Sequence, residues 1–574
     1  MPEKIKNLIK KILRNLKIEE SNFVVEHPED FKNGDYSTNV AMVCAKKSKI
    51  NPKELAEKIK RELEKKLSKE IGKIDLADPG FINFFLARKF FAENVEEILN
   101  KGENVGKNDV LIDQKIMIEY TDPNPFKPFH IGHLMTNAIG ESMARILEHS
   151  GAEVSRANYQ GDVGLHVAKA IYSLLKDKKL QDKKSSSIIQ AANIGKAYTQ
   201  GAQAYESNSV SQLVAKKEID KINKKIYDKT DKKINEIYNW GFKVTMKAFE
   251  DLYRVLGTKF EFYFLESQMA PIGERIVKDN LGKVFEKSDG AIVFKAEKHD
   301  PKLHTRVFIT SEGLPTYETK ELGLTEEKFN TDPDMNLSIV VTANEQADYM
   351  KVVAKVISLI HPEHEKKMFH ITHGMMKLAD GKMSSRKGNT VTGESLIRDT
   401  ISLIGEKIKE RNFSEKERKK IASDVGVSAI KYSVLKQATG GDIIYNFEES
   451  ISFEGDSGPY LQYSYVRANS VLEKAKKEDI LPDPQAFPPE IFEVEKLLYR
   501  FPEIVLRSAR EYEPHYIANY LIEVARAFNS FYGNISIVDK RDKTSAYKVA
   551  LTYAFTFVMK TGLHLLGIVV PEKM

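Results

Sequence analysis

A predicted order of strand, loop, helix and strand between residues 115 and 159 constrains the fold of this chain more than any other feature. Residues 115–120 (KIMIEY) form a short apolar run of β character, and a loop containing three prolines follows them. Residues 153–159 form the next strand-like run. The helix between the two runs has one apolar face, formed by Met135, Ile139, Met143, Ile146 and Leu147. This βαβ unit predicts a parallel sheet whose sites lie at the carboxyl ends of its strands.

Residues from about 175 to 260 interrupt this alternation and are predicted to be a helical insertion. Isoleucines at helical spacing predict one long helix whose other face is rich in lysine: Ile219, Ile222, Ile226, Ile234 and Ile237. We interpret these lysines as a solvated face, with RNA contact as the weaker alternative. The sheet is expected to resume in strand-like segments at residues 291–294, 306–310, 337–342 and 367–376.

The two ends of the chain complete the predicted organisation. Residues 1–105 are interpreted as an α+β unit with an amphipathic first helix, and from about residue 395 the chain is predicted to be almost entirely helical. An apolar stripe there is interpreted as core: Ile517, Tyr520, Leu521, Val524, Phe528 and Phe531. We therefore predict a multidomain α/β and all-α fold, with an α+β domain (1–105), a Rossmann-type parallel-sheet catalytic domain (106–394) carrying the insertion, and a helical bundle (395–574).

Composition narrows the class of protein. The chain has 574 residues, of which 41% are hydrophobic and 30% charged, as is typical of a globular protein with several domains. Cys44 is the only cysteine, so a disulfide within the chain is impossible and a zinc site built on thiolates is not expected. We expect no structural metal. No run approaches the roughly 20 apolar residues of a spanning helix. The net charge of +6 permits a polyanionic partner without requiring one. A reducing, cytoplasmic location without a membrane partner is expected.

The segment Phe129-His130-Ile131-Gly132-His133 lies where the proline loop meets the helix. A helix N-terminus offers free N–H groups and a partial positive charge to a phosphate. Gly132 lets a nucleotide approach the backbone, and the two imidazoles can donate hydrogen bonds to phosphate oxygens as charge builds up on them. The alternatives are helix-capping or metal-binding histidines. The strand–loop–helix context favours a phosphate site.

A second segment, residues 382–389 (KMSSRKGN), combines three cations, two hydroxyls and a glycine. Such a composition suits a loop that closes over a triphosphate. Taken alone, a segment of this kind is more often an ordinary surface loop. It gains weight because it follows a βαβ unit that already contains the histidine segment.

In this order, the two segments resemble the HIGH and KMSKS signatures of class I aminoacyl-tRNA synthetases. The wider resemblance is to the arginyl-tRNA synthetase family and covers essentially the whole chain. Residues 34–39 (GDYSTN) and 80–84 (GFINF) resemble its additional N-terminal, tRNA-binding domain. Residues 158–162 (NYQGD) resemble a strand motif of its catalytic domain. Residues 458–463 (GPYLQY) and the ending PEKM resemble its DALR-type anticodon-binding domain.

The resemblance implies roles for individual residues. It assigns catalysis to His130, His133, Lys127 and Lys387, and ATP binding to Gly132, Lys382, Met383, Ser384, Ser385 and Arg386. It assigns arginine binding to Glu119, Asn124, Tyr317 and Glu321, with Gln346 as a looser candidate, and tRNA binding to Asn83, Tyr460, Arg467 and Met574. Independently, a guanidinium has five donors in a planar fork, so its pocket needs carboxylates within bidentate reach. For each lone carboxylate the alternative is a surface charge, for Tyr460 helix packing, and for Arg467 a surface ion pair.

The chain departs from the family pattern at two positions. Ser385 replaces the second lysine of KMSKS, and Lys127, just before the histidine segment, is implied to supply the missing charge. Glu321 stands where the family commonly has aspartate, and its extra methylene shifts the carboxylate in the arginine pocket.

The implied reaction has two steps. The carboxylate of L-arginine attacks the α-phosphorus of Mg-ATP to give arginyl-adenylate, and a ribose hydroxyl at the 3′ end of tRNA(Arg) then takes the arginyl group. The family resemblance implies that tRNA binds before the first step, and a monomer that does not bind DNA is expected. The alternatives are another class I synthetase such as a glutamyl or class I lysyl enzyme, a small-molecule nucleotidyltransferase, and a non-catalytic tRNA-binding paralogue.

Overall fold

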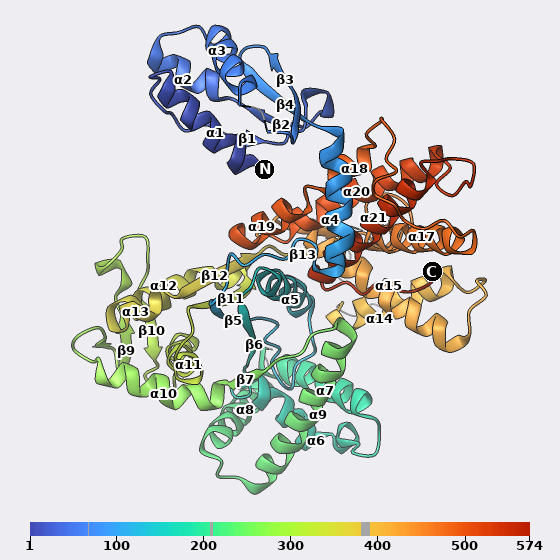
Figure 1. Ribbon diagram of the computed structural model, residues 1–574. Helices are drawn as coiled ribbons and strands as arrows, with labels where there is room; N and C mark the ends of the chain where they lie inside the picture. Colours follow the sequence, from blue (N-terminus) through green and yellow to red (C-terminus); the bar gives the residue numbers. More distant parts are fainter. Residues whose placement is uncertain (67, 207–209, 380–390) are drawn as a thin grey trace. The chain divides into compact units, whose positions relative to one another are not determined.

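A computed structural model describes residues 1–66, 68–206, 210–379 and 391–574 (Figure 1). The described residues form two compact units. Unit 1 contains Met1–Val105, Arg467–Phe501 and Glu523–Met559, and unit 2 contains Gly106–Val466, Pro502–Ile522 and Lys560–Met574.

Unit 1 is built on an antiparallel sheet with the strand order β1-β2-β4-β3. Its strands are β1 (Val25–Glu26), β2 (Tyr36–Thr38), β3 (Ile71–Ala77) and β4 (Phe81–Leu86). The helices at its N-terminal end are α1 (Pro2–Asn15), η1 (Phe31–Asn33), α2 (Val40–Ser48), α3 (Pro52–Glu64), α4 (Arg88–Lys101) and η2 (Gly102–Asn104). The amphipathic first helix predicted from the sequence is confirmed, because Ile5, Ile9, Ile12 and Leu13 of α1 are buried in the core of this unit.

A buried polar network joins α4 to later helices of unit 1. Arg88, at the start of α4, pairs with Glu495 on α18 (Glu493–Leu498) at 2.8 Å, and Tyr547 donates a hydrogen bond to the same carboxylate. The side chain of Glu495 is 0% exposed. A carboxylate removed from water in this way depends on its partners to remain ionised.

Unit 2 contains a parallel sheet of five strands among the described residues, in the order β12-β11-β5-β6-β7. These strands are β5 (Lys115–Glu119), β6 (Glu153–Gln160), β7 (Phe262–Leu265), β11 (Leu337–Ala343) and β12 (Met368–His373). Helix α5 (Ile131–His149) connects β5 to β6, so the predicted βαβ unit is confirmed. Strands β5 and β11 are buried over most of their length, as expected for a sheet covered on both faces.

The insertion between β6 and β7 is helical, as predicted. It contains α6 (Leu165–Lys176), η3 (Lys178–Gln181), α7 (Ser187–Glu206), α8 (Val210–Asp228) and α9 (Lys232–Leu256), which Figure 1 shows gathered near β7. The prediction of one long helix through the isoleucines was wrong, because α8 ends before α9 begins. Lys229 has a φ of 53°, and Asp231 caps α9 by accepting hydrogen bonds from the N–H groups of Lys233 and Ile234. An aspartate at this position marks the start of a helix, and the spacing of the isoleucines alone does not reveal that start.

A second expectation was also wrong. Residues 291–294 and 306–310 do form strands, but β9 (Ala291–Phe294) and β10 (Arg306–Ile309) belong to a separate antiparallel sheet with β8 (Glu286–Ser288). Asp289 and Gly290 join β8 to β9 with φ values of 47° and 80°. Two positive φ values in a two-residue Asp-Gly connection are the signature of a tight hairpin, which forces antiparallel pairing.

The remaining elements of unit 2 flank the sheet or follow it. They are α10 (Glu266–Asp279), η4 (Ala296–Lys298), α11 (Tyr317–Thr331), η5 (Asn344–Gln346), α12 (Ala347–Ile360), α13 (Pro362–Glu365), β13 (Met376–Leu378), α14 (Gly393–Lys407), α15 (Glu415–Leu435), β14 (Ile443–Tyr445) and α16 (Phe447–Ser450). Strand β13 pairs in parallel with β14.

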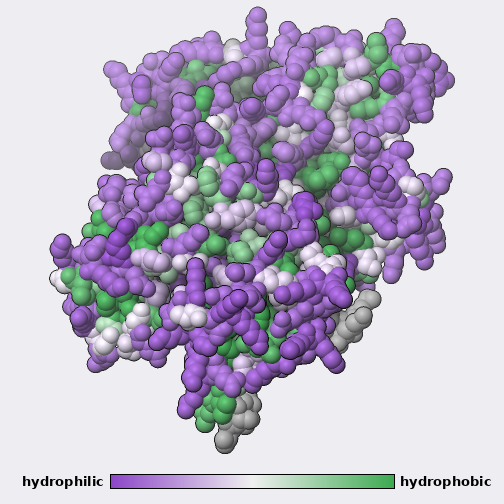
Figure 2. All heavy atoms as spheres, turned by 90° about the horizontal axis from the view of Figure 1, so that it is seen from below, coloured by the Kyte–Doolittle hydropathy of each residue, from purple (hydrophilic) through white to green (hydrophobic). Residues whose placement is uncertain are grey.

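The C-terminal end of the chain is helical, as predicted. Helices that contribute residues to both units are α17 (Gly458–Lys477), α19 (Phe501–Glu511), α20 (His515–Asn534) and α21 (Ser545–Leu565). The apolar stripe of α20 is buried along its whole length, which confirms its interpretation as core. No helix in the described part of the chain combines the length and apolarity that a membrane span needs. Figure 2 shows a largely hydrophilic surface with small apolar patches.

We expect Arg88→Met to lower the free energy of unfolding by about 3–5 kcal/mol, because it leaves the buried Glu495 carboxylate without its cation. Urea unfolding followed by circular dichroism measures this loss. The matched control is Lys89→Met, whose exposed pair with Glu93 (3.4 Å; 74% and 54% exposed) should contribute less than about 1 kcal/mol. Equal losses in the two variants would contradict the importance of this buried pair.

Candidate active site

A cavity of about 330 Å³ lies at the carboxyl edge of the parallel sheet. Its lining includes Glu119, Ala343 and His373, which are the last residues of β5, β11 and β12. The start of α5 contributes His130, Gly132 and His133. This is the edge at which parallel α/β sheets place their ligands.

The loop from β5 to α5 is strained. Thr121, Asp122 and Phe126 have φ values of 81°, 47° and 69°, a region that non-glycine residues adopt only at a cost of order 1–3 kcal/mol each. Hydrogen bonds from β6 and the residue after it hold the loop. The N–H of Tyr159 donates to Asp122 Oδ1 at 2.7 Å, and the N–H of Gly161 donates to Asn124 Oδ1 at 3.0 Å. A Cβ on residue 161 would stand 2.4 Å from that oxygen, so glycine is needed there.

The two histidines form the N-terminal cap of α5. The N–H of His133 donates to His130 Nδ1 at 3.4 Å, and the N–H of His130 donates to His133 Nδ1 at 3.2 Å. The rings stack with their centroids 3.3 Å apart. Burial lowers the pKa of His130 to about 4 and the pKa of His133 well below its usual value. Both imidazoles are therefore neutral at pH 7, with Nδ1 accepting and the proton on Nε2.

Helix capping, one of the alternatives for these histidines, is therefore present, and it does not compete with a phosphate role. The cap fixes the tautomer that leaves Nε2–H as a donor in a cavity wall. Gly132 makes the arrangement possible, because a Cβ there would stand 3.0 Å from the His130 ring. A pair of neutral donors beside free helix N–H groups can hold a phosphate oxygen.

Lys127 lies in the loop before α5 and faces the insertion. Its Nζ is 5.6 Å from the ring centroid of Tyr198 on α7. Burial lowers the pKa of Lys127, and the Glu266 carboxylate acts in the opposite direction. A partly buried cation near the histidines can attract a nucleotide phosphate.

Carboxylates dominate the charge of the cavity. Glu119 forms an ion pair with Lys328 on α11, and the two side chains are 3% and 5% exposed. Glu266, the first residue of α10, pairs with Lys320 at 2.5 Å. Two of the buried carboxylates are thus matched by lysines from α11.

Asp122 and Glu321 line the same cavity in a different electrostatic state. Burial and the neighbouring Glu119 together raise the pKa of Glu321 to about 8, against the lowering effect of Lys328. Burial and Glu119 also hold the pKa of Asp122 well above its usual value. These carboxyls would ionise readily only when a further cation enters the cavity.

The cavity brings together most of the residues predicted for substrate binding: Glu119, Asn124, His130, Gly132, His133, Tyr317, Glu321 and Gln346. Gln346 accepts a hydrogen bond from Tyr349 at 3.0 Å, which orients its amide. The predicted residues Lys382, Met383, Ser384, Ser385, Arg386 and Lys387 lie outside the described residues.

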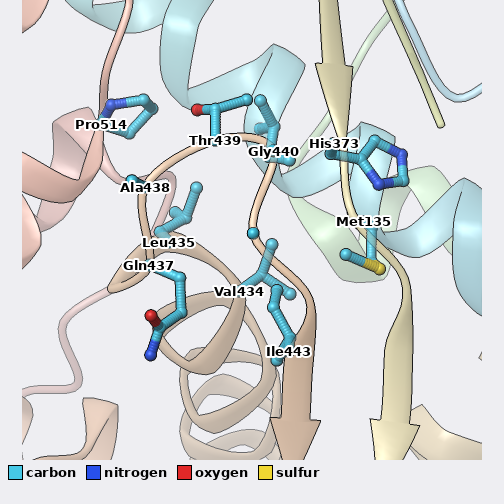
Figure 3. A pocket seen from close by; sticks show the side chains of 12 residues that line it. Met135, His373, Val434, Leu435, Gln437, Ala438, Thr439, Gly440, Ile443 and Pro514 are labelled. Atoms are coloured by element: carbon cyan, nitrogen blue, oxygen red, sulfur yellow. The ribbon is translucent and has the colours of Figure 1, made fainter. Parts of the chain in front are cut away.

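A smaller cavity adjoins the first, because His373 lines both. Figure 3 shows His373 and Met135 near the loop that carries Ala438, Thr439 and Gly440. The short strand β13 begins three residues after His373 and leads to Ala379, the last described residue before the predicted triphosphate loop.

The residues predicted to bind tRNA lie outside this cavity. Asn83 on β4 is only 4% exposed, and its Oδ1 accepts a hydrogen bond from Ser37 at 2.7 Å. Tyr460 is half-buried on α17. The Arg467 guanidinium donates a hydrogen bond to Asn529 at 2.6 Å and lies 5.2 Å from the ring centroid of Tyr532. Both of these partners are uncharged. Met574 packs against the apolar cluster of α14 and α15.

Several cavity residues were not predicted from the sequence. Glu266 directly follows β7 in the chain, and Asp122 comes three residues after the end of β5. Both could have been identified from the rule that ligands bind at the carboxyl ends of parallel strands. Lys320 and Lys328 lie on α11 with Glu321, at positions whose pairing depends on tertiary structure. No sequence pattern distinguishes them from surface lysines.

Comparison with known proteins identifies the family. Residues 94–447 match the family described as tRNA synthetases class I (R), catalytic domain, which is more than half of the chain. Residues 3–86 match the arginyl tRNA synthetase N terminal domain, and residues 461–574 match the DALR anticodon binding domain. The chain belongs to the arginyl-tRNA synthetase family. The predicted membership of the arginyl-tRNA synthetase family is thereby confirmed.

Relatives of similar length support the assignment to the arginyl-tRNA synthetase family. The arginine–tRNA ligase of Halothermothrix orenii is 30% identical, over 100% of this chain and 99% of its own length. That of Fusobacterium nucleatum is 31% identical, over 99% and 97%. The arginyl-tRNA synthetase structure from Thermus thermophilus has a TM-score of 0.81 at 23% identity, with full coverage of both chains, and that from Plasmodium falciparum has 0.79 at 20%, over 100% of this chain and 99% of its own. These structures confirm the predicted fold.

The pKa of Glu321 predicts a pH-dependent affinity for arginine. Below about pH 8 this carboxyl holds a proton in the empty cavity, and a guanidinium pairs with it only after that proton leaves. The KM for arginine should therefore fall as pH rises from 6.5 to 8.5, by up to about tenfold per pH unit below the pKa. Steady-state charging assays measure it. Glu321→Gln should have a higher KM that varies little over this range; a slope like that of the unmodified chain would show that Glu321 is not the titrating group.

Lys328 provides a second prediction. Lys328→Met leaves Glu119 buried without its cation, which should lower the free energy of unfolding by about 3–5 kcal/mol and raise the KM for arginine. Lys328→Arg keeps the charge and should retain most of the free energy of unfolding and a KM for arginine close to that of the unmodified chain. The control is Lys278→Met on α10, whose pair with Glu274 (3.0 Å) is 61% and 29% exposed and should matter by less than about 1 kcal/mol. If the methionine and arginine variants at 328 behave alike, the charge of Lys328 is unimportant.

Proposed function

We propose that the cavity at the carboxyl edge of the sheet binds L-arginine and the phosphates of ATP, and that arginine is activated there for transfer to tRNA(Arg). The reaction class follows from the family: the chain is an ATP-dependent arginine–tRNA ligase. The observation that carries the proposal is a single cavity lined both by the capping histidines of α5 and by buried carboxylates. The histidines offer donors to phosphate, and the carboxylates offer acceptors to a guanidinium.

The amino acid specificity follows from charge and shape. Glu119 and Glu266 already have lysine partners, whereas burial raises the pKa of Asp122 and of Glu321 and so favours their protonated forms. The guanidinium of arginine would replace those protons as the counter-charge. Its planar fork can meet carboxylates in bidentate fashion, which the ammonium of lysine cannot. Asn124 and Gln346, as amides with both donors and acceptors, suit the α-amino and carboxylate groups of the substrate.

In the first step a carboxylate oxygen of arginine attacks the α-phosphorus of ATP. The bond from that phosphorus to the bridging oxygen breaks, and diphosphate leaves with the electron pair. Negative charge spreads over the phosphoryl oxygens, where Nε2–H of His130 and His133 and the N–H groups at the start of α5 would stabilise it. ATP would enter as its Mg²⁺ complex, which supplies further positive charge.

Lys127 and residues 382–387 would supply cations from the protein. Lys127 lies close enough to His130 and His133 to lower the pKa of both, and its charge would substitute for the lysine that Ser385 replaces. The segment that comprises Lys382, Met383, Ser384, Ser385, Arg386 and Lys387 begins three residues after Ala379 and would close over the triphosphate.

In the second step a ribose hydroxyl at the 3′ end of tRNA(Arg) attacks the carbonyl carbon of the adenylate, and AMP leaves. We propose that Tyr460, Arg467 and Met574 contribute to anticodon-loop binding, through stacking or phosphate contact. Asn83 would contribute by holding the β2–β4 surface, because its own side chain is buried. We also propose that the enzyme acts as a cytoplasmic monomer.

The direct test is ATP-dependent attachment of labelled arginine to total tRNA. Arginine should be attached, and lysine and glutamate should not. Attachment of lysine or glutamate in place of arginine would assign the chain to a different substrate, and no attachment of any amino acid would indicate a non-catalytic paralogue.

The role of the histidines is tested by His130→Ala with His133→Ala. This double variant should lose ATP-dependent charging, because both phosphate donors are gone. It also removes a helix cap, which costs about 0.5–2 kcal/mol. Ser414→Ala is the matched control, since it removes the capping box of α15 without touching the cavity, and it should charge tRNA normally. Full activity in the double variant, or equal loss in the control, would refute the proposed role.

A further inference from the structure

Two imidazoles and a carboxylate converge at the amino-terminal edge of the parallel sheet. His361, Glu363 and His364 lie in the turn between α12 and β12, and β12 begins at Met368. The cavity described above lies at the other end of β12, where His373 is its last residue. The cluster is therefore separate from the substrate cavity.

The three side chains face one another closely. One ligand atom from each lies within 4.8 Å of the other two. His361 Nδ1 is 3.4 Å from Glu363 Oε1, and His364 Nε2 is 4.0 Å from the same oxygen. Both separations are longer than an ordinary charge-assisted hydrogen bond of about 2.7–2.9 Å. The shorter separation matches the roughly 3.3–3.5 Å between ligand atoms that a tetrahedral ion with bonds of about 2.0–2.2 Å requires, and the longer one exceeds that range by about 0.5 Å.

The turn that carries the cluster is well ordered by its own contacts. The N–H of His364 donates to the carbonyl of His361 at 3.0 Å, and the N–H of Lys367 donates to the carbonyl of His364 at 2.9 Å. Pro362 restricts the backbone between the ligands. The His364 ring stacks on Phe329 of α11 with centroids 4.1 Å apart and an angle of 11°. The side chains therefore need little rearrangement to bind an ion.

The two nitrogens of the His364 ring have different surroundings. Nδ1 is buried and has no hydrogen-bond partner among the described residues, so it is not accessible to an ion. Nε2 is the nitrogen on the side of Glu363.

We propose that His361 Nδ1, Glu363 and His364 Nε2 bind a divalent transition-metal ion of the zinc type. Two imidazoles and one carboxylate form a recognised zinc ligand set, and water would complete the coordination. His361 and Glu363 are 42% and 62% exposed, which leaves that position open to solvent. This site differs from the expectation of no structural metal, which rested on the single cysteine and therefore concerned thiolate ligands.

A bound ion would act on structure rather than on the reaction. It would fix the turn before β12 against Phe329 near the end of α11, and the residue before Phe329 is Lys328, the partner of Glu119. Since the ion would bind only the folded turn, it should stabilise unit 2.

The test uses the full-length chain without an affinity tag, freed of metal by chelation and dialysis. Zn²⁺ is titrated in competition with a chromophoric chelator, and thermal unfolding is recorded with and without Zn²⁺. The chain should bind one more equivalent of Zn²⁺ than His361→Ala/His364→Ala does, and Zn²⁺ should raise its Tm but not that of the double variant. Glu363→Gln should weaken binding while keeping the shape of the side chain. Co²⁺ should show the intense visible absorption of a tetrahedral site.

The matched control is His299→Ala/His304→Ala, which removes two exposed histidines elsewhere in unit 2 and should leave Zn²⁺ binding unchanged. Arginine charging by the His361/His364 double variant, with Mg²⁺ present and no Zn²⁺ added, should equal that of the unmodified chain and shows that it is folded. Equal Zn²⁺ stoichiometry in the unmodified chain and this double variant would overturn the proposal, as would loss of one equivalent in the His299/His304 control. Failure of arginine charging in the unmodified chain would contradict the proposed function and leave the metal result unaffected.

Discussion

The turn from β5 into α5 determines where the imidazoles of His130 and His133 lie. The chain leaves a buried central strand, passes through residues with positive φ, and enters a helix capped by two imidazoles. The backbone strain of Thr121, Asp122 and Phe126 persists because Asn137, Tyr159 and Gly161 donate hydrogen bonds into the loop. The loop is thus held by β6 and α5, the two elements that follow it in the βαβ unit. The stability of the sheet compensates for the strain of the loop, which holds His130, His133 and Asn124 in the wall of one cavity.

Electrostatics determine what this cavity can accept. Carboxylates at the ends of β5 and β7 are buried, and buried charges need partners. Lys328 and Lys320 supply two partners from a single helix, α11, which also carries Tyr317 and Glu321. Burial raises the pKa of Asp122 and of Glu321, which favours their protonated forms until a cation comes close. Burial and Glu119 raise the pKa of Glu321 to about 8, so a guanidinium that paired with this carboxyl would displace a proton from it.

The βαβ unit, the first helix and the α20 core were predictable because hydrophobic periodicity reports which face of an element is buried. Periodicity says little about which strand pairs with which, so β9 and β10 were assigned to the wrong sheet although their positions were right. The break between α8 and α9 was missed for a similar reason, since Asp231 interrupts the helix without interrupting the isoleucine pattern. Residues that belong to sequence motifs, such as His130 and His133, could be predicted to lie together, and they line one cavity. Lys320 and Lys328 could not be predicted, because a buried lysine is recognisable only through its tertiary partner.

The central claim is that the capping histidines hold phosphate while the buried carboxylates of the same cavity hold the guanidinium. A crystal structure of the chain with arginine and a non-hydrolysable ATP analogue tests this most directly. The account predicts phosphate oxygens within hydrogen-bonding distance of Nε2 of His130 and His133, and the guanidinium in contact with Glu321. A nucleotide bound away from α5, or an arginine side chain bound away from the carboxylates, would contradict it.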